Sequence, residues 1–282
     1  ILYLRKGDSF EGDRLVRLKA KKLKKMFIDP NDENNYRGYV SRNIDMAYDA
    51  KSGKSIQTRS EIIQGSQQNN SEALMDNPED AGLYHEAKED VGRFADFLKN
   101  EDQAFANIMA IDNSDQSLGH HCVTVAAMAV ALAKKIGVVE NKQTQLLALG
   151  CLLHDIEHVH SGLNVARPLT AFSEAEMKTY HNHPLDGARR TQDKKHFDAV
   201  VVNIILQHEE FVDGKGFPKG LVESKMDPMS VIASTCNALD RKISFEGAEK
   251  KGAARQLLIS SVGRYPLKHL QLLGELMTSM KI

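Results

Sequence analysis

HDIEHVH, residues 154–160, places three histidines, an aspartate and a glutamate within seven positions. The segment follows the apolar run LLALGCLL at 146–153, in which Cys151 and Leu147 lie three and seven positions before His154. This helical spacing puts His154 on the buried face of the run. The segment is therefore either a helix end that happens to be rich in histidine or a place where His154 and Asp155 bind metal.

Three more histidines are predicted to lie on the buried faces of other helices. His121 and His208 each belong to an apolar stripe with helical spacing, over residues 121–132 and 197–208. His183 precedes Pro184, which disfavours a continued helix and is expected to fix the backbone there. A single histidine on an apolar stripe is normally a core residue held by hydrogen bonds, but four on separate helices indicate a shared site.

The chemistry of these residues favours a metal centre. Burying several imidazoles beside a carboxylate costs desolvation free energy unless something binds them together. Divalent metal ions do this, because neutral imidazole nitrogen and carboxylate oxygen are both suitable ligands for them. Asp155 has two oxygens and could bridge two ions, and a pair of metals is a standard arrangement for hydrolysing phosphate esters.

The rest of the chain indicates a mainly all-α protein with a small N-terminal module. Residues 1–50 combine strand-like alternation with helical spacing, which predicts a small α/β module. Residues 51–78 are polar and are predicted to be a linker or a connecting helix. Residues 79–282 are predicted to form an all-α domain, because helical periodicity recurs along them. The periodic segments are 79–110, 117–136, 142–158, 173–192, 196–210, 227–245, 248–261 and 266–280.

The composition argues against several classes of partner. The net charge is −1 and the sequence pI is near 6.9, so we expect no attraction to DNA or to anionic membranes. No apolar stretch reaches the roughly 20 residues needed to span a bilayer, and no signal peptide is visible. Three cysteines without CxxC spacing indicate reduced thiols and a cytoplasmic protein. The chain begins at Ile1 and not at methionine, so an upstream segment could be missing.

The order of these residues resembles the HD-GYP domain, a branch of the HD phosphohydrolase superfamily. The matching features are His121 in HCVTVA, the pairs His154-Asp155 and His183-Pro184, and the segment QHEEFVDGKGFPKG at 207–220. The resemblance covers about residues 85–282. It implies an HD-type helical bundle with two or three metal ions, iron first and manganese next. It also implies hydrolysis of cyclic di-GMP by a water that two metals activate.

The resemblance also assigns individual residues. Five positions match metal ligands of the family: His121, His154, Asp155, His183 and His208. Asp155 would bridge the ions and orient the water. Glu209 stands where the family has a second histidine, and Asn237 where it has an aspartate; both could still bind metal, the amide more weakly. Ser117 stands where some members have a glutamate for a third ion, so two ions are expected.

Three further departures concern the substrate. Glu157 and His158 stand where the motif HDxGK has glycine and lysine. A histidine with an unperturbed pKa of about 6.5 is largely uncharged at neutral pH, so a fixed cation near the phosphates is lost. Glu157 adds a negative charge where an anionic substrate would approach, and Phe217 keeps the ring of the GYP tyrosine but lacks its hydroxyl. Together these changes predict weakened or altered catalysis.

The loop DGKGFPKG at 213–220 directly follows the predicted helix of His208. Glycine, proline and aspartate form turns in many places, but this position predicts a rim of the active-site cleft that contacts substrate or a protein partner. The residues predicted to contact substrate or partner are Asp213, Gly214, Gly216, Phe217 and Pro218, together with His158.

Two functions of different classes follow from these features. The first is a metal-dependent phosphodiesterase of the HD-GYP type that acts on cyclic di-GMP, with weakened activity. The alternative is a catalytically degenerate signalling module that retains metal and binds cyclic di-GMP or a partner such as a diguanylate cyclase domain. An HD hydrolase for another nucleotide or phosphate is a third hypothesis. The polar segment 51–72 could also pair in a homodimer.

Overall fold

The computed structural model of the chain describes residues 43–113 and 116–280. The chain divides into two compact units, Ile1–Arg42 and Asn43–Ile282, of which the second is described here. The α/β module predicted for residues 1–50 therefore lies outside the described residues up to position 42. Residues 43–48, at its end, are helical.

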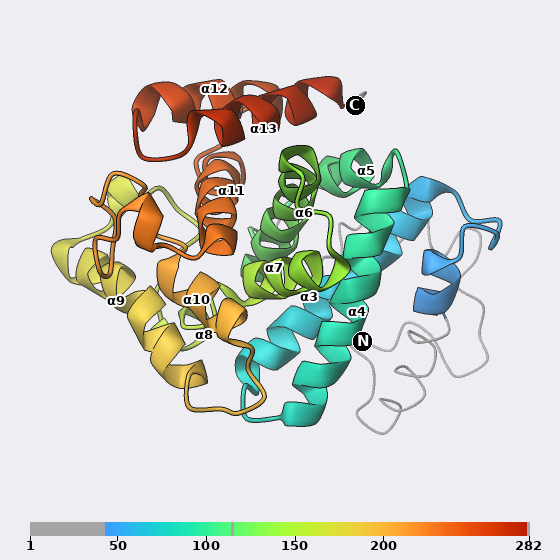
Figure 1. Cartoon of the computed structure of the whole chain (residues 1–282), viewed down its shortest axis with the longest axis horizontal. Coiled ribbons are helices and arrows are strands. Elements are labelled where there is room, and N and C mark those ends of the chain that lie inside the picture. Colours follow the sequence, from blue (N-terminus) through green and yellow to red (C-terminus); the bar gives the residue numbers. More distant parts are fainter. Residues whose placement is uncertain (1–42, 114–115, 281–282) are drawn as a thin grey trace, which may run out of the picture. The chain divides into compact units, whose positions relative to one another are not determined.

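The second unit is built from helices, as the sequence predicts for its larger part (Figure 1). Within the described ranges the β-structure consists of one isolated antiparallel bridge, between Asp213 and Val222. The α-helices are α3 (Ile56–Asp76), α4 (Ala81–Asn100), α5 (Ala104–Ala110), α6 (Leu118–Ile136), α7 (Asn141–Leu153), α8 (His158–Ser161), α9 (Glu174–Thr191), α10 (Ala199–Gln207), α11 (Pro228–Ser244), α12 (Lys250–Ser260) and α13 (Leu267–Ser279). Short 3₁₀ turns, η2 (Leu169–Ala171) and η3 (Glu223–Lys225), lie in the connections.

Helix α6 forms the centre of the unit. Nearly all its residues from Gly119 to Ala133 are fully buried, which is typical of a helix that is apolar all round. Its many alanines allow α3, α4, α5, α7, α11 and α13 to pack against it. Ser117 caps the start of the helix, because its hydroxyl accepts from the backbone N–H of His120, and Gly137 caps the end in the left-handed conformation (φ 90°). His121 thus lies in the first turn of α6, and its side chain is fully buried.

The segment predicted as a linker or connecting helix, residues 51–78, contains α3. The helix packs one face against α4, α5 and α6. Its buried face is largely polar, and these polar groups find partners: Gln67 donates to Asp90, and Arg59 donates to the carbonyl of Ala47 and to Glu101. Buried hydrogen bonds thus take the place of apolar contacts on this face of the helix. The domain boundaries themselves stay a prediction.

Two helices differ from their predicted course next to the candidate site. The helix predicted over 142–158 ends at Leu153, and residues 154–157 form a turn before α8. Conversely, Pro184 was expected to interrupt a helix but lies inside α9. A proline within a helix leaves the carbonyl four residues earlier without its usual donor. That carbonyl, of Tyr180, accepts instead from Nδ1 of His183 at 2.5 Å, which removes much of the cost.

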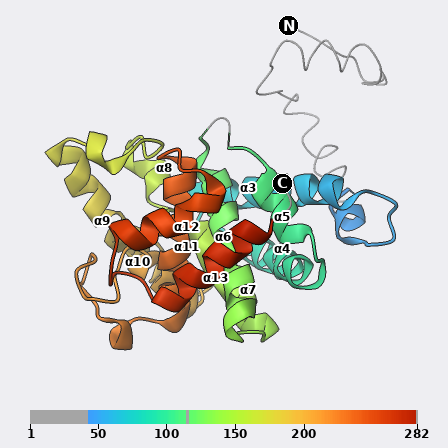
Figure 2. The same cartoon turned by 90° about the horizontal axis from the view of Figure 1, so that it is seen from above.

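The C-terminal helices α12 and α13 pack against each other and against α11, and α13 also contacts α6 (Figure 2). They therefore cover the helices that supply His121 and the residues facing it. None of the helices in the described ranges is long and apolar enough to cross a membrane.

Candidate metal centre

His154 and Asp155 lie where α7 ends. His154 is the C-cap residue of the helix, and its Nδ1 donates to the carbonyl of Cys151 at 2.7 Å. The turn that follows is closed by the backbone N–H of His158, which donates to the carbonyl of Asp155 at 2.9 Å. Both side chains are almost fully buried. The end of the apolar run therefore directs a histidine and a carboxylate into the core.

His208 occupies the same position at the end of α10. It is the C-cap residue, and its Nδ1 donates to the carbonyl of Ile205 at 2.9 Å. The two helix ends are held close by Gly150 in α7, where an added Cβ would lie 2.9 Å from Cβ of Ile204. The ring centroids of His154 and His208 are consequently 4.8 Å apart.

His121 enters from α6 and meets α11. Its Nδ1 donates to Oδ2 of Asp240 at 2.7 Å, and the same oxygen accepts from the hydroxyl of Ser244. Its Nε2 lies 3.1 Å from Oδ1 of Asn237 and 3.8 Å from Oδ2 of Asp155. Asn237 and Asp240 are thus on one face of α11, and both are turned towards His121.

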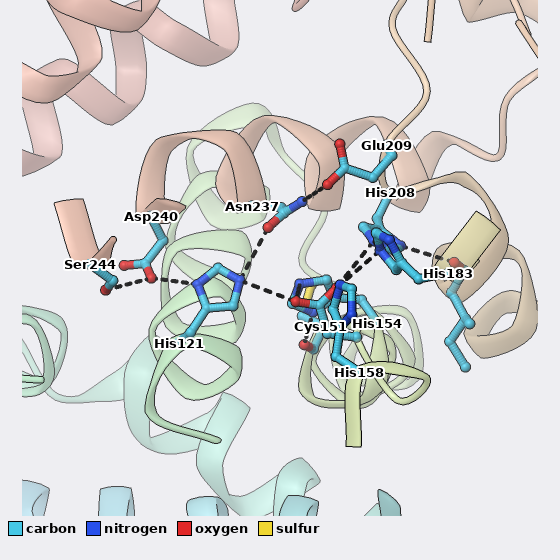
Figure 3. A network of polar contacts seen from close by, with 12 residues as sticks. His121, Cys151, His154, His158, His183, His208, Glu209, Asn237, Asp240 and Ser244 are labelled. Atoms are coloured by element: carbon cyan, nitrogen blue, oxygen red, sulfur yellow. Dashed lines mark hydrogen bonds and ion pairs between the residues drawn. The ribbon is translucent and has the colours of Figure 1, made fainter. Parts of the chain in front are cut away.

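Asp155 belongs to two clusters of histidines. The rings of these histidines, His121, His154, His183 and His208, are labelled in Figure 3. Oδ2 of Asp155 lies 3.5 Å from Nε2 of His154 and 3.8 Å from Nε2 of His121. Its Oδ1 lies 3.3 Å from Nε2 of His183 and 3.4 Å from Nε2 of His208. Ligands about 2.0–2.1 Å from one metal ion are separated by roughly 3.0–3.5 Å. The carboxylate is therefore shared by two clusters that could each hold a metal ion.

The hydrogen-bonding pattern provides a test of whether a cation fits. In His154, His183 and His208, Nδ1 faces a backbone carbonyl that can only accept, so Nδ1 holds the hydrogen of the neutral ring and Nε2 presents a lone pair. The lone pairs of His183 and His208 then face each other at 2.8 Å. Nε2 of His154 is buried and has no hydrogen-bond partner among the described residues. So many acceptors without a donor fit a site for cations.

The pKa values of these groups are shifted by burial and by the contacts between the histidines and the carboxylates. Burial lowers the pKa of His154 to about 3. Burial alone would raise the pKa of Asp155, but the facing histidines hold it well below its ordinary value. Burial alone would lower the pKa of His208, yet Asp155 and Glu209 keep it above its ordinary value. Because a metal binds the deprotonated imidazole, metal binding at this site would compete with protons.

Glu209 and Asn237 lie beside the two clusters. Oε1 of Glu209 accepts from the hydroxyl of Tyr180 at 2.5 Å and from Nδ2 of Asn237 at 3.1 Å. This bond fixes the amide of Asn237 so that its oxygen faces His121. Glu209 belongs to neither of the two convergent clusters, whereas the amide oxygen of Asn237 lies 3.1 Å from Nε2 of His121, which is in the first cluster. Their roles as ligands stay a prediction.

Glu157 does not have the effect that the sequence predicts. Both of its carboxylate oxygens accept from the guanidinium of Arg190 in α9, at 2.9 and 3.2 Å. This two-point ion pair neutralises the negative charge that was expected to oppose an anionic substrate. The prediction failed because Arg190 lies 33 positions away in the sequence and becomes a neighbour only when α9 packs beside the turn.

His158 and Phe217 lie next to the clusters. His158 is buried, its ring centroid is 4.1 Å from that of His183, and its Nε2 is 3.8 Å from Oδ1 of Asp155. Burial lowers the pKa of His158 well below its ordinary value. The ring of Phe217 lies 4.5 Å from that of His181 and 5.8 Å from that of Tyr180. The loop therefore reaches the α9 side of the site.

The other predicted loop residues shape the loop and make no contact with the histidines that converge on Asp155. Oδ1 of Asp213 accepts from the N–H of Lys215, and Gly214 has a positive φ of 78°. Gly216 packs against the backbone of residues 209–211, where an added Cβ would lie 2.6 Å from the carbonyl oxygen of Glu209. Pro218 follows a cis peptide bond.

Sequence reasoning missed three residues that the structure places at the site. Glu210 is fully buried and accepts from the backbone N–H groups of Lys219 and Leu221, so it holds the loop. Tyr180 lies three positions before His183, and that spacing in α9 is the signal that could have found it. Arg241 had no such signal, because an arginine in a helix is normally exposed.

A helical domain that gathers histidines from several helices around a His-Asp pair has the fold and site of the HD class. The model of the HD domain family matches residues 118–242. The solved structure of Bd1817, an HD-GYP protein from Bdellovibrio bacteriovorus, is 51% identical with a TM-score of 0.90, over 98% of this chain and 90% of that one. The chain belongs to the HD domain family, in its HD-GYP branch.

Two curated relatives are enzymes. A cyclic di-GMP phosphodiesterase of Pseudomonas aeruginosa is 28% identical over 149 residues, which are 53% of this chain and 36% of the relative. A 3'3'-cGAMP-specific phosphodiesterase of Vibrio cholerae is 30% identical over 136 residues, 47% of this chain and 31% of the relative. The chain thus spans about a third of the length of the curated relatives it matches.

Proposed function

We propose that the protein is a metal-dependent phosphodiesterase that hydrolyses cyclic di-GMP. The observation that carries the proposal is the sharing of Asp155 by two clusters of inward-facing imidazoles. His121 and His154 would hold one ion with Oδ2, and His183 and His208 the other with Oδ1. His and carboxylate ligands suit iron or manganese. The names of the relatives support a cyclic dinucleotide as substrate.

The proposed reaction divides the work between ions and protein. Two bound divalent ions would lower the pKa of a water and stabilise charge on the phosphoryl oxygens. Asp155 would orient that water, because its two oxygens face both clusters. The ion pair of Arg190 with Glu157 would keep the entrance free of repulsion for a phosphodiester. Tyr180 would keep Glu209 in place through its hydroxyl.

Arg241 would supply the fixed positive charge that the lysine of HDxGK gives elsewhere. It is 5% exposed, and its Nε and Nη2 have no hydrogen-bond partner among the described residues. The guanidinium lies over the rings of Tyr180 and Phe245, 5.2 and 5.4 Å from their centroids. An arginine is charged at every physiological pH, and a buried charge without a partner is costly. A phosphate, which matches its planar fork, would satisfy it.

Turnover by the metal-loaded protein tests the proposal. Protein loaded with iron(II) without oxygen, or with manganese(II), is incubated with cyclic di-GMP and with 3'3'-cGAMP, and linear products are separated by chromatography. We expect product from cyclic di-GMP, its loss in His154→Ala, and wild-type activity in a matched variant of the exposed His160, His160→Ala. Metal-loaded protein that yields no product from either dinucleotide refutes the proposed activity.

One observation favours a second function, that of a sensor. Asn237 presents an amide oxygen to the first cluster, where a carboxylate would bind an ion more strongly. A chain with a weakened first ion would bind cyclic di-GMP, or a partner such as a diguanylate cyclase domain, without efficient turnover. Binding of cyclic di-GMP in calorimetry together with an absence of product supports this function over the first.

A further inference from the structure

His158 stands where the family pattern has a lysine, but its imidazole is turned into the core. The ring is stacked on Tyr180, with centroids 5.7 Å apart and planes within 11°, and its other neighbour is His183. The side chain is 1% exposed. Nε2 is fully buried and has no hydrogen-bond partner among the described residues. A buried polar atom without a partner calls for an explanation.

Nδ1 of His158 has a hydrogen-bond partner in the described part of the chain, whereas Nε2 does not. Nδ1 lies 3.4 Å from Oγ of Ser161, whose hydroxyl also donates to the carbonyl of His158 at 3.3 Å. With the hydroxyl hydrogen on that carbonyl, Nδ1 holds the hydrogen of the ring and Nε2 is an acceptor. His154, His183 and His208 show the same pattern, in which Nδ1 faces a backbone carbonyl and Nε2 lies near Asp155.

The position of Nε2 associates His158 with one cluster in particular. It lies 3.8 Å from Oδ1 of Asp155, the oxygen that faces His183 and His208. The backbone bond from the N–H of His158 to the carbonyl of Asp155 fixes the turn that connects the two residues. His158 is thus presented to the second cluster by the same turn that presents the carboxylate.

We propose that Nε2 of His158 is a ligand of the ion held by Oδ1 of Asp155, His183 and His208. This inference rests on the metal centre proposed above and extends it. A lysine is a strongly hydrated cation and would stay away from a metal ion, whereas a neutral imidazole binds one. The exchange therefore removes a charge from the substrate side and adds a fourth protein ligand to the second ion. That ion is held more tightly and has one open position fewer.

Metal retention tests the role of His158 without any substrate. The full chain is loaded with cobalt(II), dialysed against increasing concentrations of a chelator, and analysed for bound metal. The variants are His158→Ala, His158→Lys, and His160→Ala as a matched control, since His160 is two positions away and exposed. We expect wild type and His160→Ala to retain two ions, and both His158 variants to bind the second ion at least about 10-fold more weakly.

The visible absorption of the cobalt(II) protein provides a second measurement, because its intensity depends on the number and geometry of ligands. We expect the spectrum to change in both His158 variants and to stay the same in His160→Ala. If His158→Ala does not fold, the metal retention and the cobalt(II) spectrum of His158→Lys test whether His158 is a ligand. Equal retention and identical spectra in wild type and His158→Lys overturn the inference. A wild-type protein that binds no metal overturns the proposed function as well, so the two failures are distinguishable.

Discussion

Removal of the metal ions from the folded protein is expected to lower its melting temperature by about 10–20 °C. The ions would join residues from α6, α7, α9 and α10, which approach one another through Asp155. Once they are removed, the lone pairs of His183 and His208 face each other at 2.8 Å. The apoprotein must then bind a proton or move these helix ends apart.

The magnitude follows from the two clusters. An ion kept at a free concentration 100 times its Kd stabilises the folded state by about 2.7 kcal/mol, provided that it does not bind the unfolded chain. Two such ions contribute about 5 kcal/mol. For a domain of this size, each kcal/mol shifts Tm by about 2–4 °C, which gives the expected range.

Calorimetry of metal-loaded and chelated protein measures the shift, with elemental analysis of both samples. Asp155→Asn should abolish most of it, because the shared carboxylate contributes to both clusters. Asp186→Asn is the control: this aspartate is exposed, pairs only with Arg189 in the described part of the chain, and should leave the shift unchanged. A sample shown to fall from two ions to none with an unchanged Tm contradicts the metal centre as described.

Three further outcomes are expected. Glu210→Ala should lower the free energy of unfolding by about 3–5 kcal/mol in urea titrations, because two backbone N–H groups of the loop lose a buried, charged acceptor. Arg241→Lys should lower kcat/KM for cyclic di-GMP about 10- to 100-fold in initial-rate assays, because the two-point fork is lost. The metal-free protein should lose about 2 kcal/mol of stability between pH 6.5 and pH 5.5. Burial keeps the rings of His154 and His158 neutral in the folded state, so each contributes about 1 kcal/mol as the same ring takes up a proton in the unfolded chain. The raised pKa of His208 acts in the opposite direction but by much less, because its ring also takes up a proton in the unfolded chain.

Each of these outcomes has a control. Glu210→Gln keeps one acceptor oxygen and should lose about half as much stability as Glu210→Ala. Lys242→Met changes the neighbour of Arg241 that pairs with Glu246, and should leave kcat/KM unaltered. In His154→Gln one of the two buried neutral rings is removed, so the loss of stability on acidification should fall to about half. Stability that increases as the pH falls would contradict the assignment of neutral histidines.

The helices and the central histidines could be predicted because both depend on local pattern. Apolar residues at helical spacing define α6, α7 and α10, and His121, His154 and His208 belong to those stripes. Four histidines with one aspartate then indicate a shared site, and the structure brings them together around Asp155.

The remaining features depend on contacts that spacing does not encode. Arg190 neutralises Glu157 across 33 positions, and the polar face of α3 is buried through hydrogen bonds. Pro184 stays inside α9 because the imidazole of His183 satisfies the free carbonyl of Tyr180. In each case a partner that is not predictable from the local pattern satisfies the charge or polar group that would otherwise be unfavourable there. Arg241, which we propose to bind the substrate phosphate, is of the same kind.

The hydrogen bonds from imidazole Nδ1 to backbone carbonyls give these histidines a second, structural role within their helices. His154 and His208 satisfy carbonyls of the last turns of α7 and α10, and His183 satisfies the carbonyl that Pro184 leaves free. Replacing any of them exposes a buried carbonyl whether or not a metal is bound. Natural selection for folding alone would therefore preserve these histidines after catalysis is lost. To tell whether a member of this branch has lost activity, substitutions at positions such as Asn237 and His158 are more informative, because these side chains do not bind a helix carbonyl in this way.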